Sequence, residues 1–272
     1  MARRAADLDT LSFSVVVHSM AAVALVFLIA PTVVLLVTSF TGGETLRFPP
    51  EGYSLRWYAA LAQADQLKDA ALNSLIVAAW TTLLSVLLGV SGALALWRSR
   101  SKWARAVDML FMSPLLLPAL ALGFAMLVYF NMIGLVGLPI AALVAGHTVL
   151  CVPFVLRNTI AALSQLNPAM LEASLSLGAT GLHTFRRVTL PLIAPGIAAG
   201  AFIAFMSSFD NVPISLFVAD ARTLMLPTHM WEIIEQNLDV RAAAASGVIV
   251  IFTLLMMIIA ERFAGLSSQL SR

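Results

Sequence analysis

Residues 72–97 read LNSLIVAAWTTLLSVLLGVSGALALW and contain no Asp, Glu, Lys or Arg. A bilayer core about 30 Å thick needs about 20 predominantly apolar residues in a helix, so this stretch is long enough to span it. The rest of the chain is similar, because 60% of its 272 residues are hydrophobic and 11% are charged. Soluble domains carry about 25% charged residues. The composition excludes a soluble domain, a disordered chain, a coiled coil and a disulfide scaffold, and indicates a polytopic membrane protein.

Six apolar runs have the length of a membrane span: residues 13–40, 72–97, 107–130, 138–156, 190–217 and 242–260. Asp108 stands near the beginning of the third run and Asp210 lies within the fifth, whereas the other four runs are free of charged residues. Backbone polar groups in lipid need partners within the segment, so each run is expected to be a helix. The predicted fold is all-α, with six transmembrane helices in a single domain over residues 1–272.

The basic residues predict how the chain is oriented in the membrane. If the spans alternate, eleven Lys and Arg residues fall on one side: Arg3, Arg4, Arg98, Arg100, Lys102, Arg105, Arg157, Arg186, Arg187, Arg262 and Arg272. Five fall on the other side: Arg47, Arg56, Lys68, Arg222 and Arg241. Cytoplasmic loops carry the excess of basic residues, so both termini are predicted to be cytoplasmic. The first run is longer than the apolar part of a signal peptide, and we expect it to remain as the first span.

Three loops are long enough to carry function. Residues 41–71 and 218–241 are predicted to lie outside, and their aromatic residues are expected at the membrane interface or on short surface helices: Trp57, Tyr58 and Trp231. The loop at residues 157–189 is predicted to be cytoplasmic. Small residues at helical spacing in the spans predict close helix contacts: Gly89, Gly92, Gly196 and Gly200.

The cytoplasmic loop contains two helix signals in succession. Residues 167–178 read NPAMLEASLSLG, in which Asn167 is a good N-cap, Pro168 suits the first helical position and Gly178 can end the helix in the left-handed conformation. This pattern predicts a helix of about ten residues. Thr180 can cap a second short helix, expected to end at Pro191, with three apolar residues on one face: Leu182, Phe185 and Val188. Two such helices form a rigid protrusion with an apolar face, which suits docking into a groove on another protein.

The same loop resembles a known sequence motif. Its pattern Glu172-Ala173-Ser174-x3-Gly178-x9-Val188-x-Leu190-Pro191 is similar to the EAA motif of binding-protein-dependent ABC importer permeases, Glu-Ala-Ala-x3-Gly-x9-Ile-x-Leu-Pro. All the spacings fit. Ser174 and Val188 depart from the motif, and both departures are conservative in volume.

The resemblance implies a type I ABC importer permease-like bundle in the bacterial inner membrane. It implies that the loop carries the coupling helix, which inserts into a cleft on a cytoplasmic ATPase subunit, with six ATPase-coupling residues: Glu172, Ala173, Ser174, Gly178, Leu190 and Pro191. The implied partners are two such ATPases, a second permease subunit and a periplasmic solute-binding protein. The second permease is either homologous or identical, and the polyamine-type resemblance favours a distinct homologous chain. ATP and Mg are then bound by the ATPase, and this chain needs no cofactor.

Other segments resemble one branch of that family, the spermidine/putrescine permeases. They are Leu72-Asn73-Ser74-Leu75, Pro114-x3-Pro118-x4-Gly123, and the stretch from Ser207 to Pro227. The implied solute is a polyamine or a related cationic amine. Relatives in this branch that carry opines, aminoethylphosphonate, thiamine or ferric iron provide the alternative solutes.

Asp210 is the single charged residue deep in a predicted span. A carboxylate at the centre of a membrane helix costs at least about 2.5 kcal/mol on insertion scales, so it usually faces a cavity or a partner. One interpretation is a pore-facing anion that helps a cationic solute to pass. In the other, Asp210 lies at the outer end of the span and caps a turn before Pro213. Asn211 and Pro118 are predicted to lie with Asp210 on the substrate pathway.

Catalytic motifs are missing from the sequence. It has one cysteine, Cys151, no HExxH pattern, no His/Cys cluster and no Gly-x4-Gly-Lys-Ser/Thr phosphate loop. We therefore expect neither a metal site nor ATP hydrolysis by this chain, and no nucleic-acid partner. A stand-alone secondary transporter would need more ionisable groups within the spans. A membrane enzyme would need paired catalytic groups at one depth, and the sequence offers none.

Overall fold

The structure is a computed structural model that describes residues 2–99, 101–237 and 240–264. Its regular elements in these ranges are helices, and Thr41 and Tyr53 form an isolated bridge. Five helical segments are long and apolar enough to cross a membrane, and a bent pair of helices would make a sixth. The all-helical prediction is confirmed, and the number of spans is five or six. The predicted orientation stays a prediction, and two of its basic residues, Arg100 and Arg272, lie outside the described residues.

The contacts group the chain into two compact units, of which one combines residues 1–63 with 233–251 and the other combines 64–232 with 252–272. The first unit contains α1 (Ala2–Ser39), α2 (Arg56–Leu61) and the beginning of α12 (Val240–Ala264). The second unit holds the helices α3 to α10. The single domain expected from the sequence stays a prediction.

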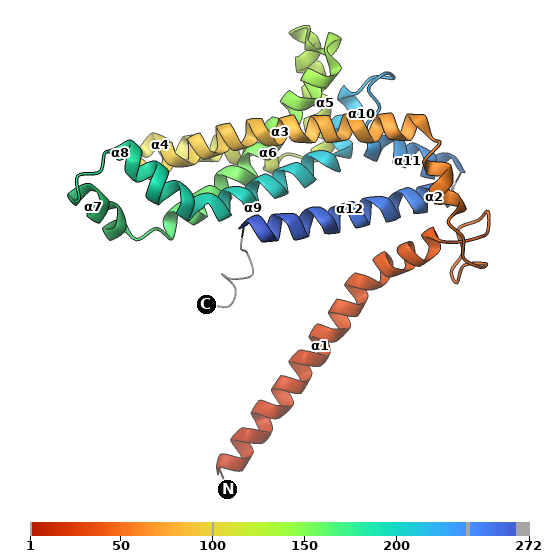
Figure 1. Cartoon of the computed structure of the whole chain (residues 1–272), viewed down its shortest axis with the longest axis horizontal. Coiled ribbons are helices and arrows are strands. Elements are labelled where there is room, and N and C mark those ends of the chain that lie inside the picture. The colour runs from red at the N-terminus through yellow and green to blue at the C-terminus, as the bar shows by residue number, and fades with distance from the viewer. Residues whose placement is uncertain (1, 100, 238–239, 265–272) are drawn as a thin grey trace. The chain divides into compact units, whose positions relative to one another are not determined.

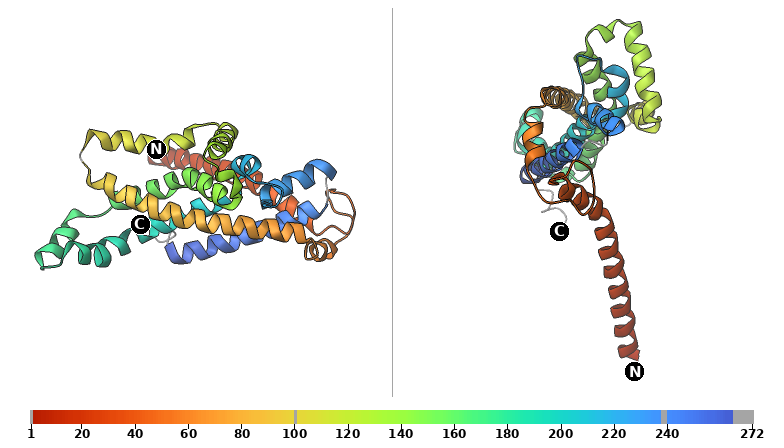
Figure 2. Two further views of the ribbon diagram at one scale, coloured as in Figure 1. Left: turned by 90° about the horizontal axis from the view of Figure 1, so that it is seen from above. Right: turned by 90° about the vertical axis from the view of Figure 1, so that its right-hand side faces the viewer.

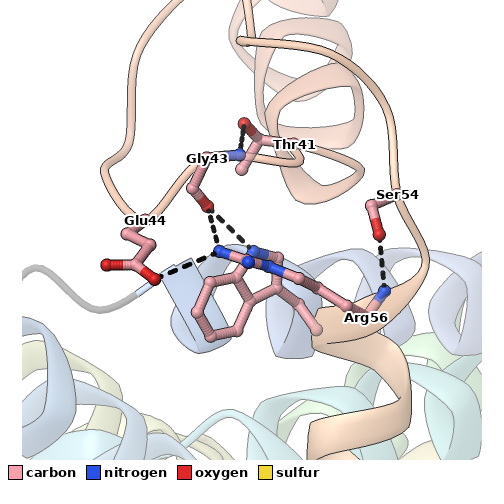
Figure 3. Close-up of polar contacts among 6 residues, drawn as sticks. Thr41, Gly43, Glu44, Ser54 and Arg56 are labelled. Atoms are coloured by element: carbon pink, nitrogen blue, oxygen red, sulfur yellow. Dashed lines mark hydrogen bonds and ion pairs between the residues drawn. The ribbon is translucent and has the colours of Figure 1, made fainter.

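In the first unit, a compact loop follows α1. The guanidinium of Arg56 lies 4.4 Å from the centre of the Trp57 ring and donates a hydrogen bond of 3.0 Å to the carbonyl of Gly43 (Figure 3). Trp57 Nε1 donates to the same carbonyl at 3.2 Å, and Glu44 pairs with Arg56 at 3.8 Å. The shared carbonyl fixes the loop against α2, since an exposed ion pair adds little. Trp57 therefore lies on a short helix, as expected.

The core of the second unit is a bundle of three long helices, α3 (Asp65–Arg98), α6 (Pro139–Ser164) and α9 (Leu190–Phe209), each of which packs against the other two (Figure 1). Glycines allow this close approach. A Cβ atom on Gly89 would lie 2.8 Å from Val155 Cβ, and one on Gly200 would lie 2.8 Å from Val155 Cα. The predicted helix contacts are confirmed at these positions. Cys151 of α6 is fully buried, with its Sγ atom 3.4 Å from the carbonyl of Ala204 on α9.

The third predicted span is broken. The expected continuous helix over residues 107–130 is wrong, because α4 (Lys102–Leu116) and α5 (Ala119–Met132) are bent by 105°. Pro118 disfavours helical geometry at the residue before it, and Leu117 has the extended ψ of 145°. Figures 1 and 2 show α5 standing steeply to the long helices. Arg157 of α6 forms an ion pair of 3.0 Å with Asp108 of α4.

Two other boundaries differ from those expected. Helix α6 continues to Ser164, so Arg157 lies within a helix and the connecting loop begins at residue 165 rather than at 157. The fifth run is divided, because α9 ends at Phe209 and a separate short helix, α10 (Val212–Val218), follows it. Helix α11 (Leu226–Asn237) lies in the last long loop and carries Trp231, as expected for a short surface helix.

Candidate functional site

Helix α7 (Pro168–Ser176) has the ends that the sequence predicts. Asn167 Oδ1 accepts a hydrogen bond of 3.0 Å from the backbone of Ala169, and Pro168 is the first helical residue. Gly178 has a φ of 84°, and its N–H donates to the carbonyl of Leu175 at 2.9 Å. The next N–H, of Ala179, donates to the carbonyl of residue 174 at 3.2 Å. These two bonds form a Schellman motif, which satisfies the last carbonyls of α7.

The second helix of the loop differs from the prediction. Helix α8 (Gly181–Thr184) is capped by Thr180 as expected, since its Oγ1 accepts a bond of 3.3 Å from His183. However, the helix does not end at Pro191. A π-helical turn, η2 (Phe185–Thr189), continues directly into α9. Proline lacks an N–H and its ring clashes with the carbonyl four residues earlier, and the wider π turn before Pro191 relieves both problems.

We call residues 167–189 the elbow. Its predicted coupling residues Glu172, Ala173 and Gly178 are exposed on or after α7. Leu190 and Pro191, also predicted to be coupling residues, begin α9 and are exposed as well. Large apolar side chains of the elbow are also exposed: Met170, Leu175, Leu177 and Leu182, of which Leu177 is 88% exposed. An apolar patch of this kind on a connecting segment is typical of a docking surface.

Ser174 behaves differently from the other coupling residues. It is half-buried, and its Oγ lies 2.9 Å from Thr184 Oγ1, at the end of α8. Thr184 itself is buried. Ser174, one of the two residues that depart from the EAA motif, thus joins the two short helices of the elbow.

A second polar region lies at the break between α9 and α10. Asp210 is the C-cap of α9 and is exposed. Asn211 is buried, and its Oδ1 accepts a bond of 2.9 Å from the backbone of Ile214, which caps α10. The capping role that the sequence offered to Asp210 therefore belongs to Asn211. Asp210 is exposed at this break, and its place on the substrate pathway stays a prediction.

Pro118 lies at a different break, the one between α4 and α5, and it is exposed there. The two breaks are connected through packing. A Cβ atom on Gly123 of α5 would lie 2.5 Å from the carbonyl of Pro213 on α10. The structure thus places Asp210 and Asn211 side by side, and relates Pro118 to them through the contact of α5 with α10.

Sequence reasoning missed His147, which is fully buried in α6. Its Nδ1 lies 2.9 Å from Ser208 Oγ on α9, and its Nε2 lies 3.4 Å from Ser215 Oγ on α10. A neutral imidazole offers one donor and one acceptor, and hydroxyl groups can complement both. His147 therefore ties α6 to both sides of the α9–α10 break. Serines within an otherwise apolar run were the available signal.

Asn73 and Ser74 hold the N-terminal half of α3 to the loop before α11. Asn73 Nδ2 donates a bond of 3.1 Å to the carbonyl of Leu224, and Ser74 Oγ accepts a bond of 2.8 Å from the backbone of Leu226. These two residues belong to one of the segments that carried the resemblance. Their role here is to position the loop that follows α10.

Comparison with protein families gives one match. Residues 85–269, more than half of the chain, match the family described as the inner membrane component of binding-protein-dependent transport systems. The matched range includes the elbow, the α9–α10 break and His147.

Several characterised proteins are similar over most of the chain. The spermidine/putrescine transport system permease protein PotC of Escherichia coli (strain K12) is 28% identical over 238 residues, which cover 88% of this chain and 89% of PotC. The putrescine transport system permease protein PotI of the same organism is 30% identical and covers 74% of this chain and 73% of PotI. The molybdenum transport system permease protein ModB of Mycobacterium bovis is 31% identical, over 74% of this chain and 80% of ModB.

Solved structures share the fold. A chain of the bacterial alginate ABC transporter, in complex with its alginate pentasaccharide-bound periplasmic protein, aligns with a TM-score of 0.69 at 19% identity, over 93% of both chains. A chain of the MetNI methionine ABC transporter in inward facing conformations aligns with a TM-score of 0.59 at 20% identity, over 73% of this chain and 94% of that chain.

Proposed function

Because the chain belongs to the family of binding-protein-dependent transport system inner membrane components, and is the permease subunit of an ABC importer, we propose that its solute is a polyamine. The similarity to PotC and PotI, two polyamine permeases, supports this choice. Similarity to ModB supports another solute as the alternative. Putrescine and spermidine are cations at neutral pH, so the exposed carboxylate of Asp210 at the α9–α10 break is a suitable group to meet them.

The elbow is the observation that supports an ATP-driven mechanism best. It presents Leu177 and its apolar neighbours outward on two short, capped helices, and η2 connects it directly to the long helix α9. A partner that grips the elbow can therefore pull on a membrane span without an intervening flexible segment. The proposed partner is a cytoplasmic ATPase, which binds ATP and Mg and hydrolyses the nucleotide. The chain itself has the role of a membrane component and not of an enzyme.

The proposed assembly contains two such ATPases, a second permease subunit that is a distinct homologous chain, and a periplasmic binding protein that delivers the solute. In this assembly the elbow and both termini face the cytoplasm, in the bacterial inner membrane. The excess of Lys and Arg on that side supports the orientation. Asp210, Asn211 and Pro118 then lie along the solute pathway.

The proposal is tested by transport in proteoliposomes that contain the chain, its partner subunits and the periplasmic binding protein. We expect uptake of labelled putrescine that requires hydrolysable ATP and is competed by spermidine. ATP-dependent uptake of another solute, without competition by either amine, would contradict the polyamine assignment. Uptake by the purified chain alone, driven by an ion gradient, would instead favour a secondary transporter.

A further inference from the structure

The two short helices of the elbow are connected by a tight link, residues 177–180. Gly178 in this link has a φ of 84°, and a Cβ at that position would meet no neighbouring atom within 4 Å. The conformation of the link is therefore determined by its backbone, and in the part of the chain that the structure describes Gly178 has no neighbouring side chains that would restrict its movement. Across the described residues, the side-chain hydrogen bond that joins α7 to α8 is the one between Ser174 and Thr184, at 2.9 Å.

Thr184 lies at the junction between α8 and the helical segment that continues into α9. It is the last residue of α8, it is 6% exposed, and η2 begins at the next residue. Its N–H donates to the carbonyl of Thr180 at 2.9 Å, so its backbone is fixed by the cap of α8. Because η2 continues into α9, a hydrogen bond to Thr184 acts on the N-terminal end of the helical segment that contains α9. Ser174 thus connects the exposed docking helix to α9 by a route that bypasses the link.

We propose that Ser174 and Thr184 are a pair of positioning residues that fix the angle between α7 and α9, so that movement of α7 reaches the span instead of bending the link. This inference rests on the proposed function, since it assumes that a partner ATPase moves α7. The EAA motif has alanine where this chain has Ser174, and an alanine side chain cannot make the bond. The Thr184 hydroxyl would then be buried without this partner, which is costly for a polar group.

The pair is tested by the number of putrescine molecules imported per ATP hydrolysed, measured with the complete complex in proteoliposomes. We expect Ser174→Ala and Thr184→Val each to lower this ratio by roughly two- to ten-fold, the range that corresponds to one net hydrogen bond. The double variant should lose no more than the more severe single variant, because both changes remove the same bond. Thr184→Ser keeps a hydroxyl and should restore most of the ratio.

Ser176→Ala is the matched control, because Ser176 is an exposed serine on the same helix. It should leave the ratio unchanged, and complex yield and thermal stability are measured for every variant. If Thr184→Val does not assemble, Ser174→Ala and Thr184→Ser still provide the test. Normal ratios in Ser174→Ala would overturn the proposal, as would fully additive losses in the double variant. If the unmodified complex does not couple uptake to ATP, the proposed function fails instead, and this result is distinct from a normal ratio in the variants.

Discussion

The elbow and the α9–α10 break differ in how they are built. The elbow is made by neighbours in sequence: Asn167, Thr180 and Gly178 act on residues within a few positions of themselves. The break is made by partners far along the chain, with His147 of α6 bonded to residues 61 and 68 positions later. The difference teaches that the elbow can be moved as one piece, whereas the break can open only if several helices separate. This division suits the proposed roles, in which a partner moves the elbow and the break lies on the solute pathway.

The proposed docking role of the elbow is tested most severely by placing a charge at its exposed end. Leu177→Asp should lower ATP-dependent uptake by more than ten-fold, because an unpaired charge buried in an interface costs about 2–5 kcal/mol. Leu177 is 88% exposed, so the change should not destabilise the chain itself. Leu177→Asn, which has the same size without the charge, is the control and should lose less. Equal uptake by Leu177→Asp and the unmodified chain would show that no partner covers this end.

The packing around the α9–α10 break is tested at the close contact between α5 and α10. Gly123→Ala places a Cβ 2.5 Å from the carbonyl of Pro213 and 2.9 Å from Phe217 Cδ2, and the helices must move apart. We expect a loss of about 1–3 kcal/mol in stability, the usual cost of overpacking. Thermal unfolding in detergent measures it. Gly137→Ala is the matched control, since its Cβ would meet nothing within 4 Å, and an equal shift in both variants would refute the packing argument.

The local construction of the elbow predicts a smaller and more confined effect. Gly178→Ala forces a side chain into the left-handed region, at a cost of about 1–2 kcal/mol. Gly181→Ala adds the same methyl group in equally open surroundings without that strain. Coupled uptake should fall several-fold in the first variant and remain normal in the second, while the thermal stability of the spans is unchanged in both. Impaired uptake in Gly181→Ala alone would contradict this interpretation of Gly178.

Asp210 is expected to give the smallest effect. Asp210→Asn removes an exposed carboxylate, and exposed ion pairs contribute up to about 1 kcal/mol, so the KM for putrescine should rise by no more than about five-fold. The rise should shrink as salt is added, because salt screens exposed charges. A KM that does not change at low salt would remove Asp210 from the solute pathway.

The sequence predicts best those features that local chemistry determines. Charge-free runs identify the long helices, because lipid requires continuous apolar surface. The bounds of α7 follow from Asn167, Pro168 and Gly178, since caps act over a few residues. The break at Pro118 was not predicted. Proline within an apolar run is compatible with either a gentle kink or a full break, and the packing of neighbouring helices selects between them.

The candidate sites follow the same rule. The coupling residues were inferred from the spacing of a sequence motif, and their role in coupling stays a prediction. His147 could not, because its importance depends on Ser208 and Ser215, which approach it only after the helices pack. The π turn before Pro191 is likewise a compromise between the proline and the continuation of the helix. The coupling pair Ser174–Thr184 could be recognised only from its geometry, since a conservative replacement in a motif gives no signal of a new bond.

The burial of Cys151 has a practical consequence for experiments on this protein. It is the single cysteine of the chain, and its thiol lies between α6 and α9 with no exposed surface. Maleimide and spin-label reagents should therefore not react with the Cys151 thiol while the protein is folded. A cysteine introduced at position 177 or 210 can then be labelled selectively in the natural background. Fluorescence or electron paramagnetic resonance can follow the elbow and the α9–α10 break in separate samples.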